Sequence, residues 1–77
     1  MQKTLGQIRH AAPLEIVAVL GDCVRAGRLA ALGFLPGGRI RVSHVAPLGD
    51  PISVSFAGQE ISVRRTEANL IAVRELG

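Results

Sequence analysis

The chain has 77 residues, of which 48% are hydrophobic, but it contains no Trp, no Tyr and only two Phe. A chain this short forms one domain, here residues 1–77, and buries roughly 60% of its unfolded surface, so its core must come from aliphatic side chains. Its formal net charge of +3 selects no class of partner, and no apolar run approaches the ~20 residues that a membrane span needs.

The first half of the chain predicts one strand and one helix. Residues 1–13 mix polar and apolar side chains and are compatible with a turn of helix. Residues 15–20 form a short segment rich in β-branched side chains, which is typical of a strand. Asp22 suits the N-cap of a helix over residues 23–32, and Gly33 stands where a left-handed residue would end that helix.

The second half opens with a turn, a strand and a loop. The Pro-Gly pair at residues 36–37 predicts a type II turn. In the strand that follows, Ile40, Val42 and His44 are expected to share one face, with His44 partly buried or at the strand end. Residues 46–51 carry two prolines around a Gly-Asp pair, which predicts a rigid loop.

A hairpin, a short helical turn and a final strand complete the chain. Residues 52–56 alternate apolar and polar side chains, and residues 57–59 are expected to form the turn from which a strand returns over residues 61–64. Thr66 is expected to cap a short helical turn. Residues 70–73 are aliphatic and predict the last strand.

Together these elements predict a mainly β fold. We expect a small SH3-like antiparallel barrel of about five strands, with one inserted α-helix and a short helical turn. The tight turns after residue 39 make the later strands antiparallel. Closure into a barrel removes exposed strand edges, and the strand at residues 15–20 is expected to complete it.

The sequence carries no recognisable catalytic motif. A nucleophile elbow, a P-loop and a dinucleotide fingerprint are all missing, so we predict no enzyme activity, no catalytic residues and no bound cofactor. The carboxylates of Asp22, Asp50 and Glu67 fall in separate caps and loops. His10 and His44 lack partners at the spacing of a zinc site, so no metal-binding residues are predicted.

Cysteine and charge usage indicate the compartment and the partners. Cys23 is the only cysteine, whereas small secreted domains normally carry pairs, and no secretory leader opens the chain, so a cytoplasmic location is expected. Basic residues are spread along the chain and stacking aromatics are nearly absent, which argues against nucleic acid as a partner. Arg64 and Arg65 end a strand, and we expect one side chain to point inward and the other outward.

Several short motifs follow one another in a fairly specific order. They are Leu5-Gly6, Leu32-Gly33, Pro36-Gly37, the Ala-Pro-Leu-Gly-Asp-Pro run at residues 46–51, Gly58, Arg64-Arg65 and Glu67-Ala68. This series, which spans nearly the whole chain, resembles the FeoA family. The resemblance implies an SH3-like barrel that supports ferrous iron uptake by acting with a FeoB-type membrane transporter, which has a cytoplasmic GTPase-type domain. The chain departs from the family pattern at Gly21-Asp22-Cys23 and Gly27, where the family's helix is usually richer in Arg and Leu.

The helix face and the loop before residue 52 are the surfaces that we expect to contact the implied partner. The candidate contact residues are Arg25, Arg28, Leu29, Leu32, Pro47, Leu48, Gly49 and Asp50. Each has a structural explanation as well, since leucines in a helix often belong to the core and the loop residues fit a turn. The membrane would be reached only through the transporter.

Three alternatives stay open. The first is an SH3-like regulatory domain of the kind found in iron-dependent repressors, and the second is a nucleic-acid-binding barrel. The third is a factor that changes nucleotide exchange or hydrolysis in a partner through one inserted arginine. The sequence leaves open whether the chain activates, inhibits or assembles the transporter, and whether it binds a transition metal ion directly.

Overall fold

The computed structural model describes residues 3–76, so both ends of the predicted domain lie outside the described residues. Six strands, two α-helices and one 3-10 turn form this part of the chain. In order they are β1 (Lys3–Thr4), η1 (Leu5–Gln7), β2 (Ala12–Val19), α1 (Cys23–Leu32), β3 (Arg39–Val45), β4 (Ile52–Phe56), β5 (Gln59–Val63), α2 (Arg65–Ala68) and β6 (Ile71–Glu75). The mainly β architecture predicted from the sequence is confirmed.

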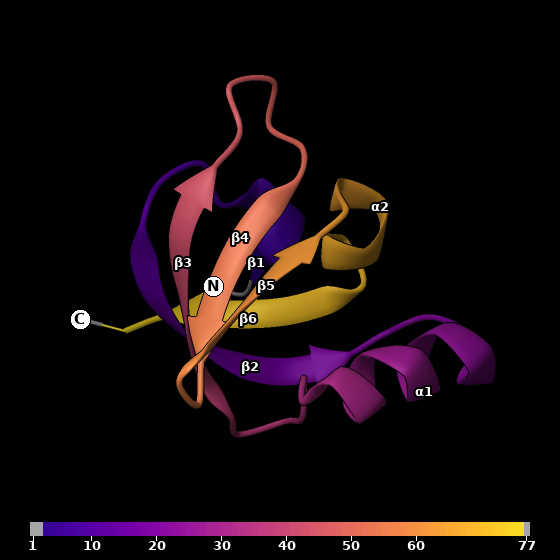
Figure 1. Ribbon diagram of the computed structural model, residues 1–77. Helices are drawn as coiled ribbons and strands as arrows, with labels where there is room; N and C mark the ends of the chain where they lie inside the picture. Colours follow the sequence, from indigo (N-terminus) through magenta and orange to yellow (C-terminus); the bar gives the residue numbers. More distant parts are fainter. Residues whose placement is uncertain (1–2, 77) are drawn as a thin grey trace.

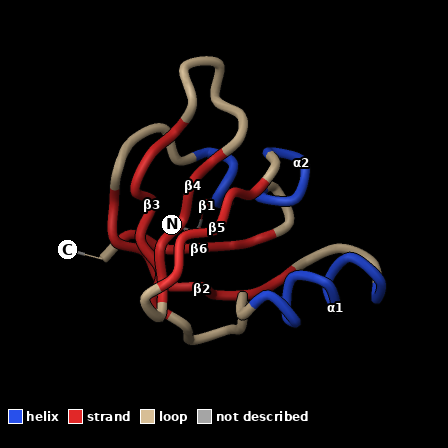
Figure 2. Tube along the Cα trace, in the orientation of Figure 1, coloured by secondary structure: helices blue, strands red, loops and turns tan. Residues whose placement is uncertain are grey.

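All six strands belong to one antiparallel sheet with the order β1-β6-β2-β3-β4-β5. The sheet curls on itself, while α1 lies beside one end of β2 and α2 beside the end of β5 (Figures 1 and 2). Strand β2 is paired on both sides, with β3 and with β6. The first predicted strand therefore lies in the interior of the sheet and joins its two parts.

The core lies inside the curled sheet and is almost entirely aliphatic. Leu14 and Ile16 of β2, Val54 of β4 and Val73 of β6 are fully buried. Phe34 is the one aromatic residue among the buried side chains that the structure describes, and its ring centroid lies 5.3 Å from that of the partly buried Phe56. Alternation along β2 and β4 sends these side chains inward and leaves their neighbours less buried, whereas Ile71, Ala72 and Val73 of β6 are all buried.

Helix α1 has the start and end that the sequence predicts. The Asp22 carboxylate accepts a hydrogen bond of 2.8 Å from the backbone N–H of Arg25, so it caps the first turn. Gly33 has φ of 110° and ends the helix in the left-handed conformation. A β-carbon at residue 33 would lie 2.6 Å from a ring carbon of Phe56, so glycine is also required by packing.

The structure adds elements before residue 13 and extends the predicted strands. Strand β1 has two residues, which pair with Val73 and Ala72 of β6, and η1 is the helical turn allowed for this segment. Strand β2 begins at Ala12, earlier than predicted, because Pro13 pairs with Arg41 of β3 in spite of its missing N–H. These pairings join residues far apart in the sequence, which local patterns do not encode.

The predicted orientation of His44 is wrong. A bulge shifts the register of β3 against β4 between Val42 and His44, so Val42 stays opposite Val54 while His44 lies opposite Ser53. Ser43 and His44 are both exposed, and Val45 turns back toward the core. The extra residue of a bulge breaks the strict alternation on which the prediction relied.

The prediction of a cap by Thr66 is also wrong. Helix α2 begins two residues earlier, with Arg64 at its N-cap position and no capping bond from the side chain of that residue. The backbone N–H of Arg65 instead donates a hydrogen bond of 3.0 Å to the carboxylate of Asp50. The hairpin turn before α2 is tighter than predicted, because Phe56 pairs directly with Gln59.

Candidate functional site

The exposed side of α1 combines apolar and basic side chains. We call this surface the α1 face and define it by Val24, Arg25, Arg28 and Leu32. Val24 is 78% exposed and Leu32 is 45% exposed, and both arginines are exposed. Among the described side chains of α1, Leu29 alone is buried, at 1% exposure. The helix is therefore anchored by one leucine and presents most of its surface to solvent.

A hollow separates the α1 face from α2. Its volume is about 310 Å³, and Arg25, Thr66, Glu67 and Leu70 line it. The guanidinium of Arg28 lies 3.8 Å from the carboxylate of Glu67, which links the two helices across this hollow. The ion pair is exposed on the arginine side, so it fixes the relative position of the helices weakly.

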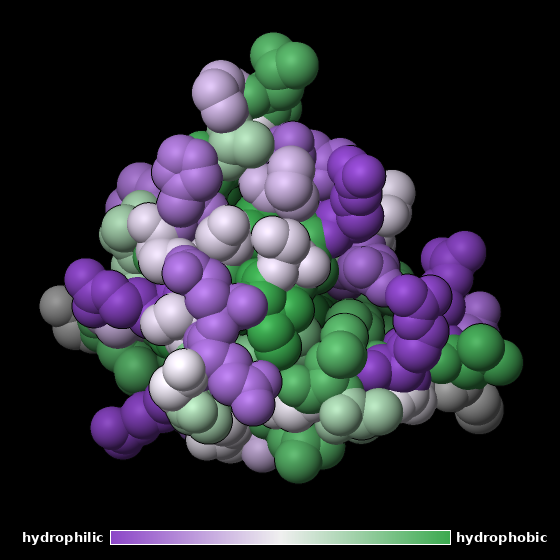
Figure 3. Space-filling view, in the orientation of Figure 1, coloured by the Kyte–Doolittle hydropathy of each residue, from purple (hydrophilic) through white to green (hydrophobic). Residues whose placement is uncertain are grey.

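The loop at residues 46–51 projects from the opposite part of the molecule, at the top of Figure 1. Two backbone hydrogen bonds hold it, from the Gly49 N–H to the Ala46 carbonyl at 2.7 Å and from the Ala46 N–H to the Pro51 carbonyl at 3.2 Å. Leu48 is 93% exposed. Figure 3 shows hydrophobic atoms at the tip of this projection, above a collar of hydrophilic side chains.

Asp50 connects this loop to α2. One of its carboxylate oxygens accepts the hydrogen bond from the Arg65 N–H, and the other lies 3.9 Å from the guanidinium of Arg64. The Arg65 side chain turns back to the loop, where its Nη1 donates a bond of 3.4 Å to the Gly49 carbonyl. The arginine pair does not end a strand as predicted, since β5 ends at Val63 and Arg65 opens α2, but the expected difference in orientation is seen, with Arg64 exposed and Arg65 half-buried.

Two guanidinium groups converge on Gly49. A β-carbon at residue 49 would lie 2.5 Å from Nη1 of Arg65 and 2.7 Å from Nη1 of Arg9, so the two nitrogens can be no farther apart than the sum of these distances. Arg9 also lines an open hollow of about 490 Å³ together with residues 45–49. We call Arg9, Arg64, Arg65 and the loop at residues 46–51 the arginine end.

The structure sorts the predicted contact residues into two separate places. Arg25, Arg28 and Leu32 share the α1 face, and Leu29 beneath them is excluded from contact by its burial. The remaining candidates lie in the projecting loop, where Pro47 and Leu48 are exposed, Gly49 is buried and Asp50 bonds to α2. Arg9 was missed, because no local pattern near residue 9 indicates that it reaches this loop.

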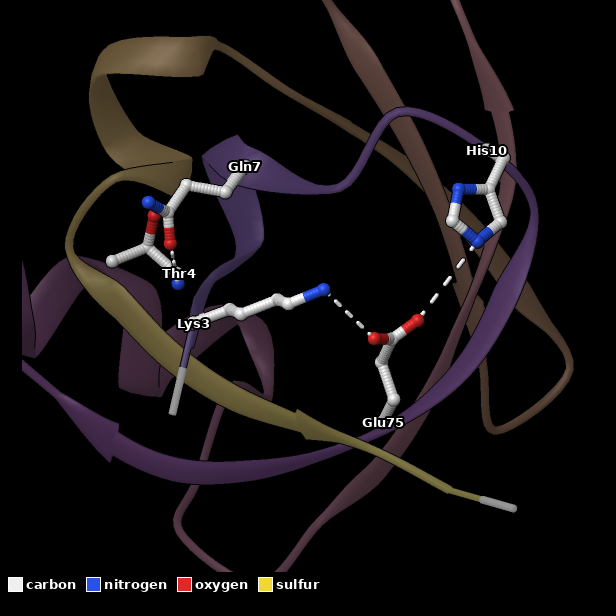
Figure 4. A network of polar contacts seen from close by, with 5 residues as sticks. All are labelled: Lys3, Thr4, Gln7, His10 and Glu75. Carbon is white, nitrogen blue, oxygen red and sulfur yellow. Dashed lines mark hydrogen bonds and ion pairs between the residues drawn. The ribbon is translucent and has the colours of Figure 1, made fainter. Parts of the chain in front are cut away.

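A third polar cluster joins the two ends of the described chain. Lys3 of β1 donates a hydrogen bond of 2.9 Å to the carboxylate of Glu75 in β6, and His10 lies 3.8 Å from the other oxygen (Figure 4). The hydrogen bond from Lys3 and its positive charge lower the pKa of Glu75, and His10 adds a smaller contribution in the same direction. This cluster fastens the edge strand β1 to β6.

Two further findings concern metals and membranes. Among the side chains that the structure describes, no three from His, Cys, Asp and Glu come together where they could hold a metal ion. No helix within residues 3–76 has the length and apolar character needed to cross a bilayer.

Comparison with known proteins identifies relatives across nearly the whole chain. The sequence profile described as FeoA domain matches residues 3–75. The chain is similar to the FeoA protein of Chlorobium tepidum, with 33% identity over 97% of this chain and 71% of that chain and a TM-score of 0.85. It is also similar to a structure described as an iron uptake regulatory protein (FeoA), with 25% identity, 99% of both chains covered and a TM-score of 0.85.

Transcriptional repressors share the fold. A manganese-dependent transcriptional repressor is 21% identical, with a TM-score of 0.87, and 97% of this chain matches 37% of that chain. These neighbours agree with the SH3-like architecture predicted from the sequence. At this identity the likeness extends to the fold alone.

Proposed function

This chain belongs to the FeoA domain family, and on that premise we propose that it is a cytoplasmic accessory protein of ferrous iron uptake. It acts by binding the cytoplasmic GTPase-type domain of a FeoB-type transporter and modulating or assembling that transporter, without catalysis of its own. Family membership and the iron uptake described for a relative support the general role. The choice of partner rests on the family resemblance, and the choice of contact surface rests on the exposed side chains of α1.

The α1 face is the surface that we propose for this contact. One observation carries the proposal: α1 buries a single leucine among its described side chains while Val24 and Leu32 stay exposed beside Arg25 and Arg28. An exposed apolar side chain gains about 25 cal/mol for each Å² that a partner covers. Flanking arginines select an acidic partner surface and speed the encounter.

The test compares two double charge reversals on different faces. In the first variant Arg25 and Arg28 both become Glu, and in the control Arg39 and Arg41 of β3, which are also exposed, become Glu. Both variants lower the net charge equally. Capture of the transporter's purified cytoplasmic domain is measured at low salt, with nucleotide present, together with its rate of GTP hydrolysis.

We expect the first variant to weaken capture by tenfold or more and the control to weaken it only slightly. A changed hydrolysis rate on capture identifies a modulator, and capture without a change identifies an assembly factor. The proposed surface is wrong if both variants bind like the unmodified protein. Thermal unfolding of each variant shows whether a loss of capture comes from a loss of fold.

A regulatory domain of the repressor type is the second candidate function, and the shared fold with metal-dependent repressors favours it. In that case the chain should fail to capture the transporter domain and should instead associate with a DNA-binding protein. A mobility-shift titration against salt tests direct nucleic-acid binding, because phosphate contacts give a steep salt dependence.

A further inference from the structure

We propose that the arginine end is a membrane-contact site, at which Arg9 and Arg65 bind a phosphate-type oxyanion of an anionic phospholipid while Leu48 enters the apolar layer. This inference does not rest on the proposed function, because the lipid surface is its only partner. It starts from the unbalanced charge of this end of the molecule.

Three guanidinium groups face one carboxylate here. Arg64 is the one that pairs with Asp50, at 3.9 Å. Arg9 and Arg65 form no ion pair with an acidic side chain anywhere in the described chain, although their Nη1 atoms converge on Gly49. Two like charges held close together without a counter-charge are suited to share one oxyanion, because guanidinium groups bind phosphate and carboxylate oxygens through paired hydrogen bonds.

The backbone at Gly49 makes this convergence possible. Gly49 has φ of 85°, and the space that a β-carbon would take is occupied by the ends of the two arginine side chains. The Arg65 guanidinium is further directed by its bond to the Gly49 carbonyl. The position of the two positive charges is therefore a property of the folded loop rather than of surface side chains that happen to be near.

The exposure of Leu48 favours a lipid headgroup as the source of the oxyanion. It is 93% exposed on a projecting loop, and the other residues that line the adjoining hollow beside Arg9 are Val45, Ala46, Pro47 and Gly49. A stable protein interface covers roughly 800 Å² on each partner, with a broad apolar centre. One exposed leucine beside three arginines is too small an apolar surface for a stable protein interface. It matches a bilayer, where an apolar side chain enters the interface and basic residues bind phosphates at the surface.

The experiment measures co-sedimentation of the protein with vesicles. Vesicles of phosphatidylcholine alone are compared with vesicles that contain one third phosphatidylglycerol, at low salt and at physiological salt. We expect sedimentation only with the anionic vesicles, and weaker sedimentation at the higher salt because screening shortens the reach of the arginines. The proposal is overturned if the unmodified protein stays in solution with anionic vesicles at low salt.

Three variants separate the specific site from net charge. Arg9→Gln combined with Arg65→Gln should lower the vesicle partition coefficient by about 25-fold, at about fivefold for each basic residue. The control, Arg39→Gln with Arg41→Gln, removes the same charge from β3 and should have a much smaller effect. Gly49→Ala preserves every charge but places a methyl group where the guanidinium groups meet, so weaker binding by a folded G49A protein supports the site.

Further measurements distinguish a membrane from a free anion and from a protein as the ligand of this site. Leu48→Ser should lower partition about tenfold at unchanged charge, because it removes the inserted apolar side chain. If inorganic phosphate perturbs the arginine end while anionic vesicles do not bind, the site takes a free anion and the membrane proposal is wrong. If L48S binds vesicles normally but loses capture by the transporter's cytoplasmic domain, the loop contacts protein and the proposal is likewise overturned.

Discussion

The α1 face and the arginine end are both exposed and basic, but the fold depends on them differently. The exposed residues of α1 bond to little else, since Leu29, the one buried side chain among those described in this helix, lies beneath them. At the arginine end, exposed residues also hold the structure. The exposed Asp50 bonds to the first turn of α2, and the guanidinium groups of Arg9 and Arg65 lie against the buried Gly49. Changes on the α1 face should therefore cost the fold little, whereas the loop combines surface and support.

The largest expected effect on stability comes from Leu29, which lies beneath the α1 face. Leu29→Ala should lower the free energy of unfolding by about 3 kcal/mol, because it removes the helix anchor and leaves a cavity. Leu32→Ala, on the exposed side at 45% exposure, should cost less than about 1 kcal/mol. Urea unfolding measures both. Equal losses would mean that the outer side of α1 is as strongly tied to the core as the inner side.

A smaller effect is expected from the carboxylate that supports the arginine end. Asp50→Ala should destabilise the protein by about 1–2 kcal/mol, because the Arg65 N–H loses its acceptor and Arg64 its counter-charge. Asp22→Ala removes the matching bond at α1 and should cost about 1 kcal/mol.

Amide hydrogen exchange shows which helix each of these two substitutions destabilises. D50A should speed exchange in α2 and leave α1 unchanged, and D22A should do the reverse. If D50A left α2 protected, the loop and α2 would be independent, and the contrast between the two regions would fail.

An increase in stability is predicted on the α1 face. Gly27 is exposed within the helix, and nothing lies within 4 Å of the position that a β-carbon would take. Gly27→Ala should therefore stabilise the protein by up to about 1 kcal/mol. A thermal melt tests this, and a fall in Tm would contradict it. If G27A is more stable but captures the transporter domain less well, the partner packs closely against this residue.

The smallest expected effect on stability concerns the ion cluster at Glu75. This cluster belongs neither to the α1 face nor to the arginine end, so it serves as a reference. Its lowered pKa means that the folded state favours the ionised carboxylate, so its contribution to stability is present above the ordinary value of 4.5 and is lost as pH falls through the lowered pKa. Glu75→Gln should reduce the difference between the free energies of unfolding at neutral and at acid pH. Chemical unfolding at several pH values checks this, and parallel curves for E75Q and the unmodified protein would contradict it.

Sequence patterns predicted the features that depend on neighbouring residues. The cap at Asp22, the end of α1 at Gly33 and the hairpin between β4 and β5 all follow from side chains a few positions apart. The surfaces were harder to predict. Asp50 meets Arg65 across 15 positions, and Arg9 reaches a loop some 40 residues later, so neither contact leaves a local pattern. The candidate list therefore contained the loop but not the arginines that surround it.

The place of β6 in the sheet has a consequence during synthesis on the ribosome. Among the described strands β6 comes last in the sequence, yet it lies between β1 and β2, which come first among them. Until residue 75 has left the exit tunnel, β2 therefore presents an open edge to any neighbouring chain. Such edges favour pairing between nascent chains. Because about 50 residues separate the end of β2 from the start of β6, this interval lasts only seconds at ordinary rates of elongation, and ribosome pausing near the codons for β6 would prolong it.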